Sequence, residues 1–277
     1  MKISTVFFLV GIVGLFSANQ TCIAQWSHDP NTNTPVCTVA GDQYTPAMTG
    51  DDSGGTIFAW TDPRSGSGDI YAQRFTKEGV RLWTLNGVQI INAPNNQDAP
   101  VIASDGSGGA IIVWPDARNG IDYDIYAQRI NSAGVPQWTA NGVPICTATG
   151  FQASPLIIPD GSGGAIITWV DQRSGPQDIY AQRVNGAGVV QWTSNGVPIC
   201  TAADNQSFPA MISDGSGGTI IVWEDNRTGT TPDIYAQRVN SAGTAQWTAN
   251  GVPVCTASSS QLFPQCVGDS SGAISKV

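Results

Sequence analysis

The chain has 277 residues, with 21 aspartates and glutamates against 12 lysines and arginines, and its formal net charge is −9. An acidic surface repels nucleic-acid phosphates and anionic lipid head groups, so we expect neither nucleic acid nor a membrane surface as a partner. The 32 glycines, the 17 prolines and the many β-branched residues are typical of an all-β protein with tight turns.

The first residues have the pattern of a secretory signal peptide. Lys2 supplies a positive charge, residues 6–18 form an apolar run, and Cys22 and Ala24 place small side chains before a cleavage site at Gln25. The apolar run is shorter than the roughly 20 residues of a membrane-spanning helix, and no other stretch is long enough for one. We therefore expect residues 1–24 to be removed and residues 25–277 to be secreted, extracellular or held at the cell surface.

The hexapeptide Asp-Ile-Tyr-Ala-Gln-Arg occurs four times, beginning at Asp69, Asp124, Asp178 and Asp233. Alignment of the four copies brings a Gln-x-x-Pro motif, an Asp-x-Ser-Gly-Gly turn and all nine tryptophans into register. A repeat of about 55 residues with several turn signals predicts a β-propeller with four-stranded blades.

The strands of one unit can be ordered by their residue types. The continuous apolar run at 110–114 predicts a strand that is covered on both faces. In 124–129 the side chains alternate, with Ile125 and Ala127 on one face of the expected strand and Tyr126 and Gln128 on the other. The segments 155–158 and 142–146 contain proline, which cannot donate to a strand ladder and so belongs at an edge. We therefore expect 155–158 as innermost strand A, 110–114 as B, 124–129 as C and 142–146 as outermost strand D.

The strand count predicts four complete blades and a partial fifth. The mature chain opens with a D strand at 35–38, continues through four A-to-D sets, and ends inside a fifth set that has no strand C. This count leads us to expect a truncated chain, with the full protein continuing and carrying further domains.

The motifs Trp-x-Asp-x-Arg and Arg-x-Asn-x-x-Gly-x-x-x-Trp resemble those of the Asp-box propellers of the sialidase-like class, and the whole unit resembles secreted bacterial propeller repeats. In the second copy the motif departs from an Asp box, because its aspartate is missing and Trp138 stands four residues after Gly134. The resemblance implies a propeller fold for 25–277. It also implies a sialidase-like glycan-acting hydrolase as an alternative function.

Residues that recur in every unit are expected to be structural. The repeated Asp and Arg of the Trp-x-Asp-x-Arg motif are interpreted as salt links or turn caps. Four of the cysteines, Cys37, Cys146, Cys200 and Cys255, occupy one packing position and are expected to be buried free thiols. His28 is the single histidine, which excludes a histidine-based triad or metal site. No cofactor or metal is expected, since the turn aspartates, the only calcium candidates, lack the dense carboxylate spacing of calcium loops. Glu224 breaks its repeat position and is the one candidate partner for a catalytic tyrosine.

Two sets of loops vary between the copies, and in a propeller both lie on one face. Variable loops on a rigid frame are where binding usually occurs. The aromatic and acidic residues there suit sugar rings or peptide side chains, and the candidate site comprises Tyr44, Asp122, Tyr123, Phe151, Phe208 and Phe263. We expect a non-catalytic binding module for an extracellular glycan or protein; the alternatives are the hydrolase and a structural spacer of a longer surface protein.

Overall fold

The structure is a computed structural model that describes residues 26, 31, 33–229, 231–268 and 274–276. The predicted signal peptide lies outside these residues. The described residues form 18 strands and no helix, so the all-β prediction is confirmed. Nothing in the described part of the chain forms a helix that could cross a membrane.

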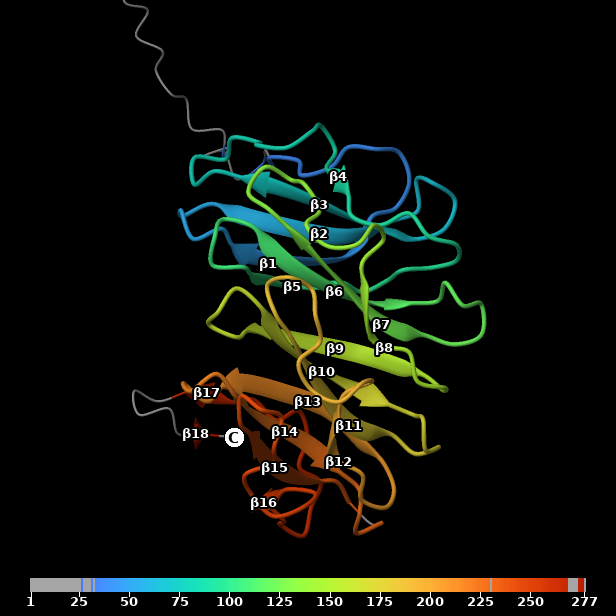
Figure 1. Ribbon diagram of the computed structural model, residues 1–277, viewed down its shortest axis with the longest axis vertical. Helices are drawn as coiled ribbons and strands as arrows, with labels where there is room; N and C mark the ends of the chain where they lie inside the picture. Colours follow the sequence, from blue (N-terminus) through green and yellow to red (C-terminus); the bar gives the residue numbers. More distant parts are fainter. Residues whose placement is uncertain (1–25, 27–30, 32, 230, 269–273, 277) are drawn as a thin grey trace, which may run out of the picture.

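Four antiparallel sheets of four strands each follow one another along the chain, and each is one blade (Figure 1). Blade 1 has β1 (Tyr44–Gly50), β2 (Thr56–Asp62), β3 (Asp69–Phe75) and β4 (Val88–Gln89). Blade 2 has β5 (Val101–Ser104), β6 (Ala110–Asp116), β7 (Asp124–Ile130) and β8 (Val143–Cys146). Blade 3 has β9 (Gln152–Pro159), β10 (Ala165–Asp171), β11 (Asp178–Val184) and β12 (Val197–Cys200). Blade 4 has β13 (Gln206–Ser213), β14 (Thr219–Asp225), β15 (Asp233–Val239) and β16 (Val252–Cys255). A fifth, two-stranded sheet pairs β17 (Val267–Gly268) with β18 (Ile274–Lys276).

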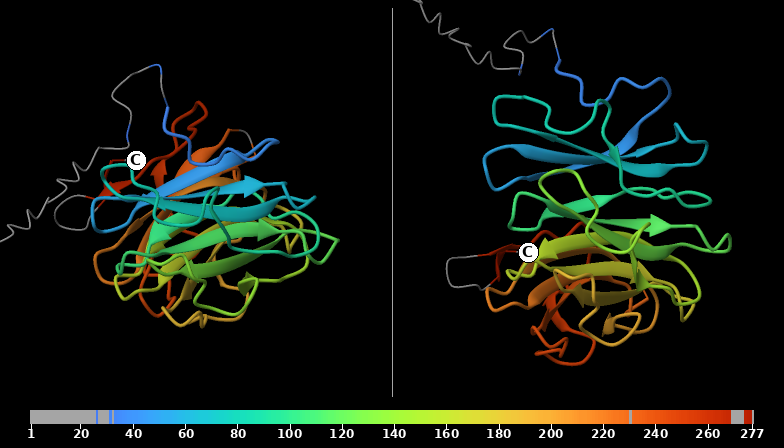
Figure 2. Two further views of the ribbon diagram at one scale, coloured as in Figure 1. Left: turned by 90° about the horizontal axis from the view of Figure 1, so that it is seen from above. Right: turned by 45° about the horizontal axis from the view of Figure 1, so that its top comes forward.

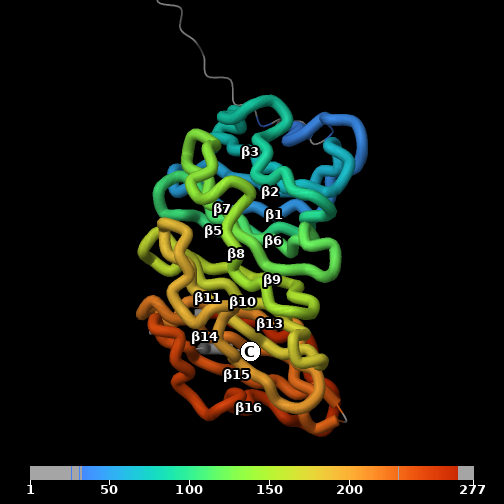
Figure 3. Tube along the Cα trace, turned by 45° about the vertical axis from the view of Figure 1, so that its right-hand side comes forward, coloured from blue at the N-terminus to red at the C-terminus, as the bar shows by residue number. Residues whose placement is uncertain are grey.

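The fold is therefore a β-propeller of four complete blades and part of a fifth, as predicted. The blades succeed one another in chain order, from blue and cyan at blade 1 to orange and red at blade 4, as the right-hand view of Figure 2 and the tube in Figure 3 show. Successive first strands pack together, β1 on β5, β5 on β9, β9 on β13 and β13 on β17, so the first strand of each blade is the innermost. These strands surround a central space of about 410 Å³ with apolar walls that include Val101, Leu156 and Met211.

The hydrophobic core lies between the blades rather than in one central mass. The second strands β6, β10 and β14 are buried along their whole length, as the continuous apolar runs predict. One core cluster joins Ile57 and Ile70 of blade 1 to Ile112 and Trp114 of blade 2, and equivalent clusters join blades 2 to 3 and 3 to 4. Blades 2 and 3 thus contribute apolar surface to both of their neighbours, which is how repeated units bury what one unit alone leaves exposed.

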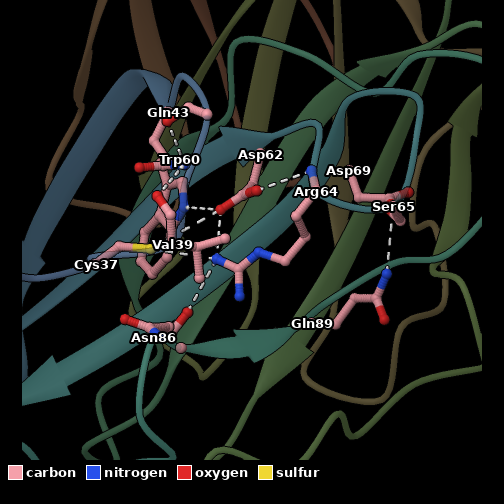
Figure 4. Close-up of polar contacts among 12 residues, drawn as sticks. Cys37, Val39, Gln43, Trp60, Asp62, Arg64, Ser65, Asp69, Asn86 and Gln89 are labelled. Carbon is pink, nitrogen blue, oxygen red and sulfur yellow. Dashed lines mark hydrogen bonds and ion pairs between the residues drawn. The ribbon is translucent and has the colours of Figure 1, made fainter.

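The repeated Trp-x-Asp-x-Arg motif forms a buried corner, shown for blade 1 in Figure 4. The Asp62 carboxylate is fully buried and accepts hydrogen bonds from Trp60 Nε1 at 3.0 Å and from the backbone N–H of Arg64 at 3.0 Å. The Arg64 guanidinium forms an ion pair with Asp62 and lies 3.9 Å from the ring centroid of Tyr71. The same corner recurs in the other three blades, so these residues are structural, as expected.

The Asp-x-Ser-Gly-Gly turn is held by its own aspartate. In blade 2, Asp105 Oδ1 accepts the backbone N–H groups of Ser107 and Gly109, each at 2.8 Å, and Oδ2 is 2.9 Å from Arg129 Nη2. A calcium ion at this turn would have to displace Arg129. Among the residues that the structure describes, no group of three or more potential metal-binding side chains gathers.

The hairpins between third and fourth strands connect each blade to the next. Asn131 Oδ1 accepts the N–H groups of Ala133 and Val135, each at 3.0 Å, so an asparagine shapes this hairpin in place of the aspartate of an Asp box. Trp138 Nε1 then donates to the Gly186 carbonyl of blade 3 at 3.0 Å. The four-stranded sheets support the propeller class. The hairpin, which is shaped by an asparagine, does not support the narrower Asp-box class.

Two expectations about the outer strands need correction. Residues 35–38 form no strand, because Thr38 donates its backbone N–H to the side chain of Asn86, at Oδ1 and 2.9 Å, and not to the backbone of a neighbouring strand. The cysteines of the repeat are free, but they are not all buried. Cys146 and Cys200 are enclosed by the corner of the following blade, whereas Cys255 is exposed.

Candidate functional site

The variable loops lie on one face because backbone hydrogen bonds join them from blade to blade. The loop after the second strand of one blade meets the loop that enters the next blade. Three equivalent bonds show this, namely Gln97 N to Gly68 O at 2.7 Å, Gln152 N to Tyr123 O at 2.8 Å, and Gln206 N to Gln177 O at 2.7 Å. We call this surface the loop face.

A groove of about 410 Å³ opens on the loop face across blades 1 to 3. It is lined by Gly66 and Ser67 of blade 1, by Asn95 and Asn96 in the loop that enters blade 2, by Ala117, Gly120, Ile121, Asp122 and Tyr123 of blade 2, and by Phe151 in the loop that enters blade 3. Its wall therefore combines amide groups, one carboxylate and two aromatic rings. Such a mixture of apolar surface and a few polar groups is typical of ligand sites.

Two of the predicted aromatic residues meet in this groove. The rings of Tyr123 and Phe151 have centroids 6.0 Å apart and planes at 38°. Phe151 is 48% exposed, so the pair presents ring surface to solvent instead of completing the core. The prediction that Asp122, Tyr123 and Phe151 share one site is consistent with their placement as three walls of the same groove.

Two carboxyl groups of blade 2 accept hydrogen bonds from the same side-chain amide, that of Asn119. Asn119 Nδ2 donates to Asp122 Oδ1 at 2.6 Å and to Asp124 Oδ2 at 3.2 Å, so the two carboxyl groups are close neighbours. The second oxygen of Asp122 accepts the backbone N–H of Gly150 at 2.8 Å, which ties it to the loop that carries Phe151. Asp122 lines the groove, and Asp124 lies behind it with 5% exposure.

The environment of Asp124 keeps it protonated in weakly acidic solution. Burial raises its pKa most strongly, the negative charges of Asp122 and Asp116 add to the effect, and together they bring the pKa to about 6. The same position in blade 3 is Asp178, whose pKa is also raised, mainly by burial. Blade 2 differs from blade 3 because a second carboxyl group, that of Asp122, lies beside Asp124, the aspartate with the raised pKa.

The sequence interpretation missed Asn119 and Asp124. Asp124 belongs to the repeated hexapeptide and was therefore assigned to structure. A signal was present, because Asn119 replaces Ser65, Ser174 and Thr228 of the other blades. In blades 1 and 3 the serine hydroxyl binds only the hexapeptide aspartate of its own blade.

The remaining predicted residues fall into two places on the loop face. Tyr44 is 38% exposed, and its pKa is raised by burial and then by the charge of Asp98 and by Tyr123, so it lies near the groove. Phe208 and Phe263 form a separate pair with centroids 5.3 Å apart and planes at 70°. The six predicted residues therefore form two groups instead of one.

The expected role of Glu224 is not what the structure shows. Glu224 as a whole residue is 4% exposed, and its Oε1 accepts the backbone N–H of Phe263 at 2.6 Å. Glu224 binds the backbone of the second aromatic pair, and within the described ranges of the chain it forms no hydrogen bond to a tyrosine.

Comparison with known proteins gives similarity in fold. No model of a protein family matches the sequence, and no curated protein matches it. The chain is similar to an alpha-L-arabinanase from Penicillium chrysogenum solved with arabinobiose, with 13% identity, a TM-score of 0.49, and coverage of 80% of this chain and 71% of that one. It is also similar to an endo-arabinase from Bacteroides thetaiotaomicron, with 14% identity, a TM-score of 0.45, and coverage of 83% and 86%. A third similar structure is the Hadza microbial sialidase Hz136, with 13% identity, a TM-score of 0.46, and coverage of 76% and 47%.

These structures correct the first functional expectation. Many of the similar propellers are glycoside hydrolases, which contradicts the expectation of a non-catalytic binding module and agrees better with the alternative of a glycan-acting hydrolase. At identities of 13% and 14% and TM-scores of 0.49 and below, the similarity carries no argument about the activity of this chain. The activity has to be argued from the residues of this chain.

Proposed function

We propose that this propeller is a glycan-acting hydrolase whose active site is the groove on the loop face. The observation that carries the proposal is the pair Asp122 and Asp124 joined through Asn119, beside the exposed rings of Tyr123 and Phe151. Glycoside hydrolysis requires a carboxyl group that gives up a proton and a second carboxylate close to it. The aromatic rings provide flat apolar surface on which a sugar ring can stack.

The two carboxyl groups have different roles in the proposed reaction. Asp124 retains a proton up to about pH 6 and is the proton source for the leaving oxygen of the glycosidic bond, either directly or through one water molecule. Asp122 faces the groove and assists the water that adds to the anomeric carbon. The water supplies its hydroxyl to the sugar, and its remaining proton restores the acid.

The proposed substrate is an uncharged glycan. The described residues that line the groove include amides, a carboxylate and aromatic rings, and they include no arginine or lysine. A sialic or uronic acid carries a carboxylate, which a cationic side chain has to neutralise in a partly buried site. We also propose that the protein acts outside the cell, as the predicted signal peptide favours.

The test is the release of reducing ends from linear arabinan, xylan and β-glucan by the purified protein. We expect turnover of at least one polymer, an activity that falls as the pH rises through about 6 because Asp124 loses its proton, and a loss of about 100-fold or more in Asp122→Asn and in Asp124→Asn.

The matched control is Asp178→Asn. It changes the equivalent aspartate of blade 3, whose pKa is raised by the same kind of burial, but no second carboxyl group shares its hydrogen-bond donor, Ser174. This variant should keep its activity. Absence of turnover on all three polymers, or full activity in Asp122→Asn, would refute the proposed function.

A further inference from the structure

One backbone N–H group in the groove lacks the partner that its equivalents have in other blades. It belongs to Tyr123, the residue directly before the hexapeptide of blade 2. The carbonyl of Tyr123 accepts the Gln152 N–H at 2.8 Å, so it faces the loop that enters blade 3. In an extended chain the N–H and the C=O of one residue point to the same side, and the Tyr123 N–H therefore faces that loop as well.

An asparagine of the next unit caps the equivalent N–H groups of blades 1 and 3. Gly68 N donates to Asn96 Oδ1 at 3.1 Å, and Gln177 N donates to Asn205 Oδ1 at 3.0 Å. In blade 4 the equivalent residue is Pro232, which has no N–H group. The asparagine cap is therefore part of the repeat, and blade 2 departs from it.

The departure is caused by Phe151, which stands where the other two units have the capping asparagine. Its backbone is held as theirs is, because Gln172 N donates to Phe151 O at 2.8 Å, but its ring offers no acceptor oxygen. Within the described ranges of the chain, the Tyr123 N–H donates to no acceptor. The ring of Phe151 instead lies beside the ring of Tyr123, and both residues line the groove together with Asp122. The change of one repeat residue thus leaves a backbone donor open next to two aromatic rings.

We propose that the Tyr123 N–H binds a hydroxyl oxygen of the sugar that stacks on Tyr123 and Phe151, and that Phe151 determines where the glycan is anchored. This inference deepens the proposed function and rests on it for the class of ligand. The donor is preorganised, because the bond from Gln152 fixes the peptide of Tyr123 before a ligand arrives. An uncharged N–H beside apolar rings suits the neutral hydroxyl of a sugar, which combines a polar oxygen with an apolar C–H face.

The test compares Phe151→Asn with Phe151→Leu. Both variants remove the ring and introduce side chains of similar shape, but only asparagine can accept the Tyr123 N–H, as Asn96 and Asn205 accept its equivalents. Binding is measured by electrophoresis in gels that contain linear arabinan, xylan or β-glucan. We expect at least one polymer to retard the natural protein, Phe151→Leu to bind that polymer more weakly, and Phe151→Asn to bind it about fivefold more weakly still. Equal binding by the two variants, or a natural protein that no polymer retards, would overturn the inference.

Two controls tie the difference to the donor itself. Amide hydrogen exchange measured by NMR should be slower at Tyr123 in Phe151→Asn than in Phe151→Leu, because the asparagine forms the cap; equal exchange would overturn the assignment of the open donor. Asn205→Leu opens the equivalent N–H of Gln177, which lies outside the groove, and should leave retardation unchanged. A loss in Asn205→Leu as large as that between the two Phe151 variants would mean that altered loop packing, and not the donor, weakens binding.

The retardation assay requires no turnover, so it separates this inference from the proposed function. If a polymer is cleaved but the two Phe151 variants bind it equally, the hydrolase stands and the anchor fails. If no polymer is cleaved but Phe151→Asn binds about fivefold more weakly than Phe151→Leu, the anchor stands and the hydrolase fails.

Discussion

The replacement of Asp225 by asparagine tests whether the buried corners hold the blades together. The Asp225 carboxylate is fully buried and accepts four N–H groups, from Trp223 Nε1 at 2.7 Å, from the Arg227 backbone at 2.9 Å, and from the Arg227 guanidinium at Nε and Nη2. Asparagine has the same shape, but it exchanges one acceptor oxygen for a donating NH₂ group. At least one donor of the corner would then face another donor.

The expected loss follows from the charge left behind. Arg227 would keep a guanidinium that is only 21% exposed and has no counter-charge in the corner. Removal of one partner from a buried ion pair costs about 3 to 5 kcal/mol, and the partial exposure of Arg227 places our expectation near the lower value. Asp204→Asn is the matched control, since Asp204 is exposed and forms no ion pair with any residue that the structure describes, and its effect should stay within about 0.5 kcal/mol.

The pH dependence gives an independent measure of the same corner. Burial alone would raise the pKa of Asp225, but the hydrogen bonds from Arg227 and Trp223 outweigh it and lower the pKa below 3.8. A carboxyl group with a lowered pKa stabilises the folded state above its unfolded pKa, and this contribution disappears as the pH falls through the folded value. The stability difference between natural protein and variant should therefore be constant near about pH 7 and shrink in acid.

Urea unfolding followed by tryptophan fluorescence measures both quantities. Trp223 lies in the altered corner and reports on it directly. A loss in Asp225→Asn no larger than that in Asp204→Asn, or a difference that grows as the pH falls, would show that the corner does not stabilise the blade by its charge pair.

Three further predictions address the core, the thiols and the fold. Trp114→Ala should cost about 3 to 5 kcal/mol because the ring is fully buried, whereas Tyr123→Ala should change the melting temperature little; equal losses would mean that Tyr123 belongs to the core. Burial raises the pKa of the Cys146 and Cys200 thiols to about 12, so a maleimide should label the exposed Cys255 first, and equal labelling rates would contradict the blade packing. Circular dichroism should show strand and almost no helix, and a helix content above about a fifth would disprove the propeller.

Much of the fold could be predicted from the sequence because each blade repeats the same short sequence motifs. The hexapeptide spacing set the length of the unit, proline marked the edge strands, and the continuous apolar run at 110–114 marked a strand covered on both faces. The proline and apolar signals are local in the chain and are present in a single copy, whereas the length of the unit follows from the spacing between copies. The assignment of the Asp and Arg of Trp-x-Asp-x-Arg to structure followed from repetition alone.

The site depended on contacts between blades, which no local pattern contains. Phe208 and Phe263 come from successive units, and only the packing of β13 on the fifth unit brings their rings together. Asp124 looked structural because its motif recurs, and its raised pKa arises from burial and from Asp122 in the folded loop. Cys255 shares its repeat position with Cys146, yet their exposure differs because the corner of a following blade covers only Cys146. The sequence by itself determined the unit and its strands. The tertiary structure decided which repeated residues acquire a different environment, because burial and electrostatic fields depend on the neighbours that the fold brings together, within one blade for Asp124 and Asp122 and from the next blade for Cys146.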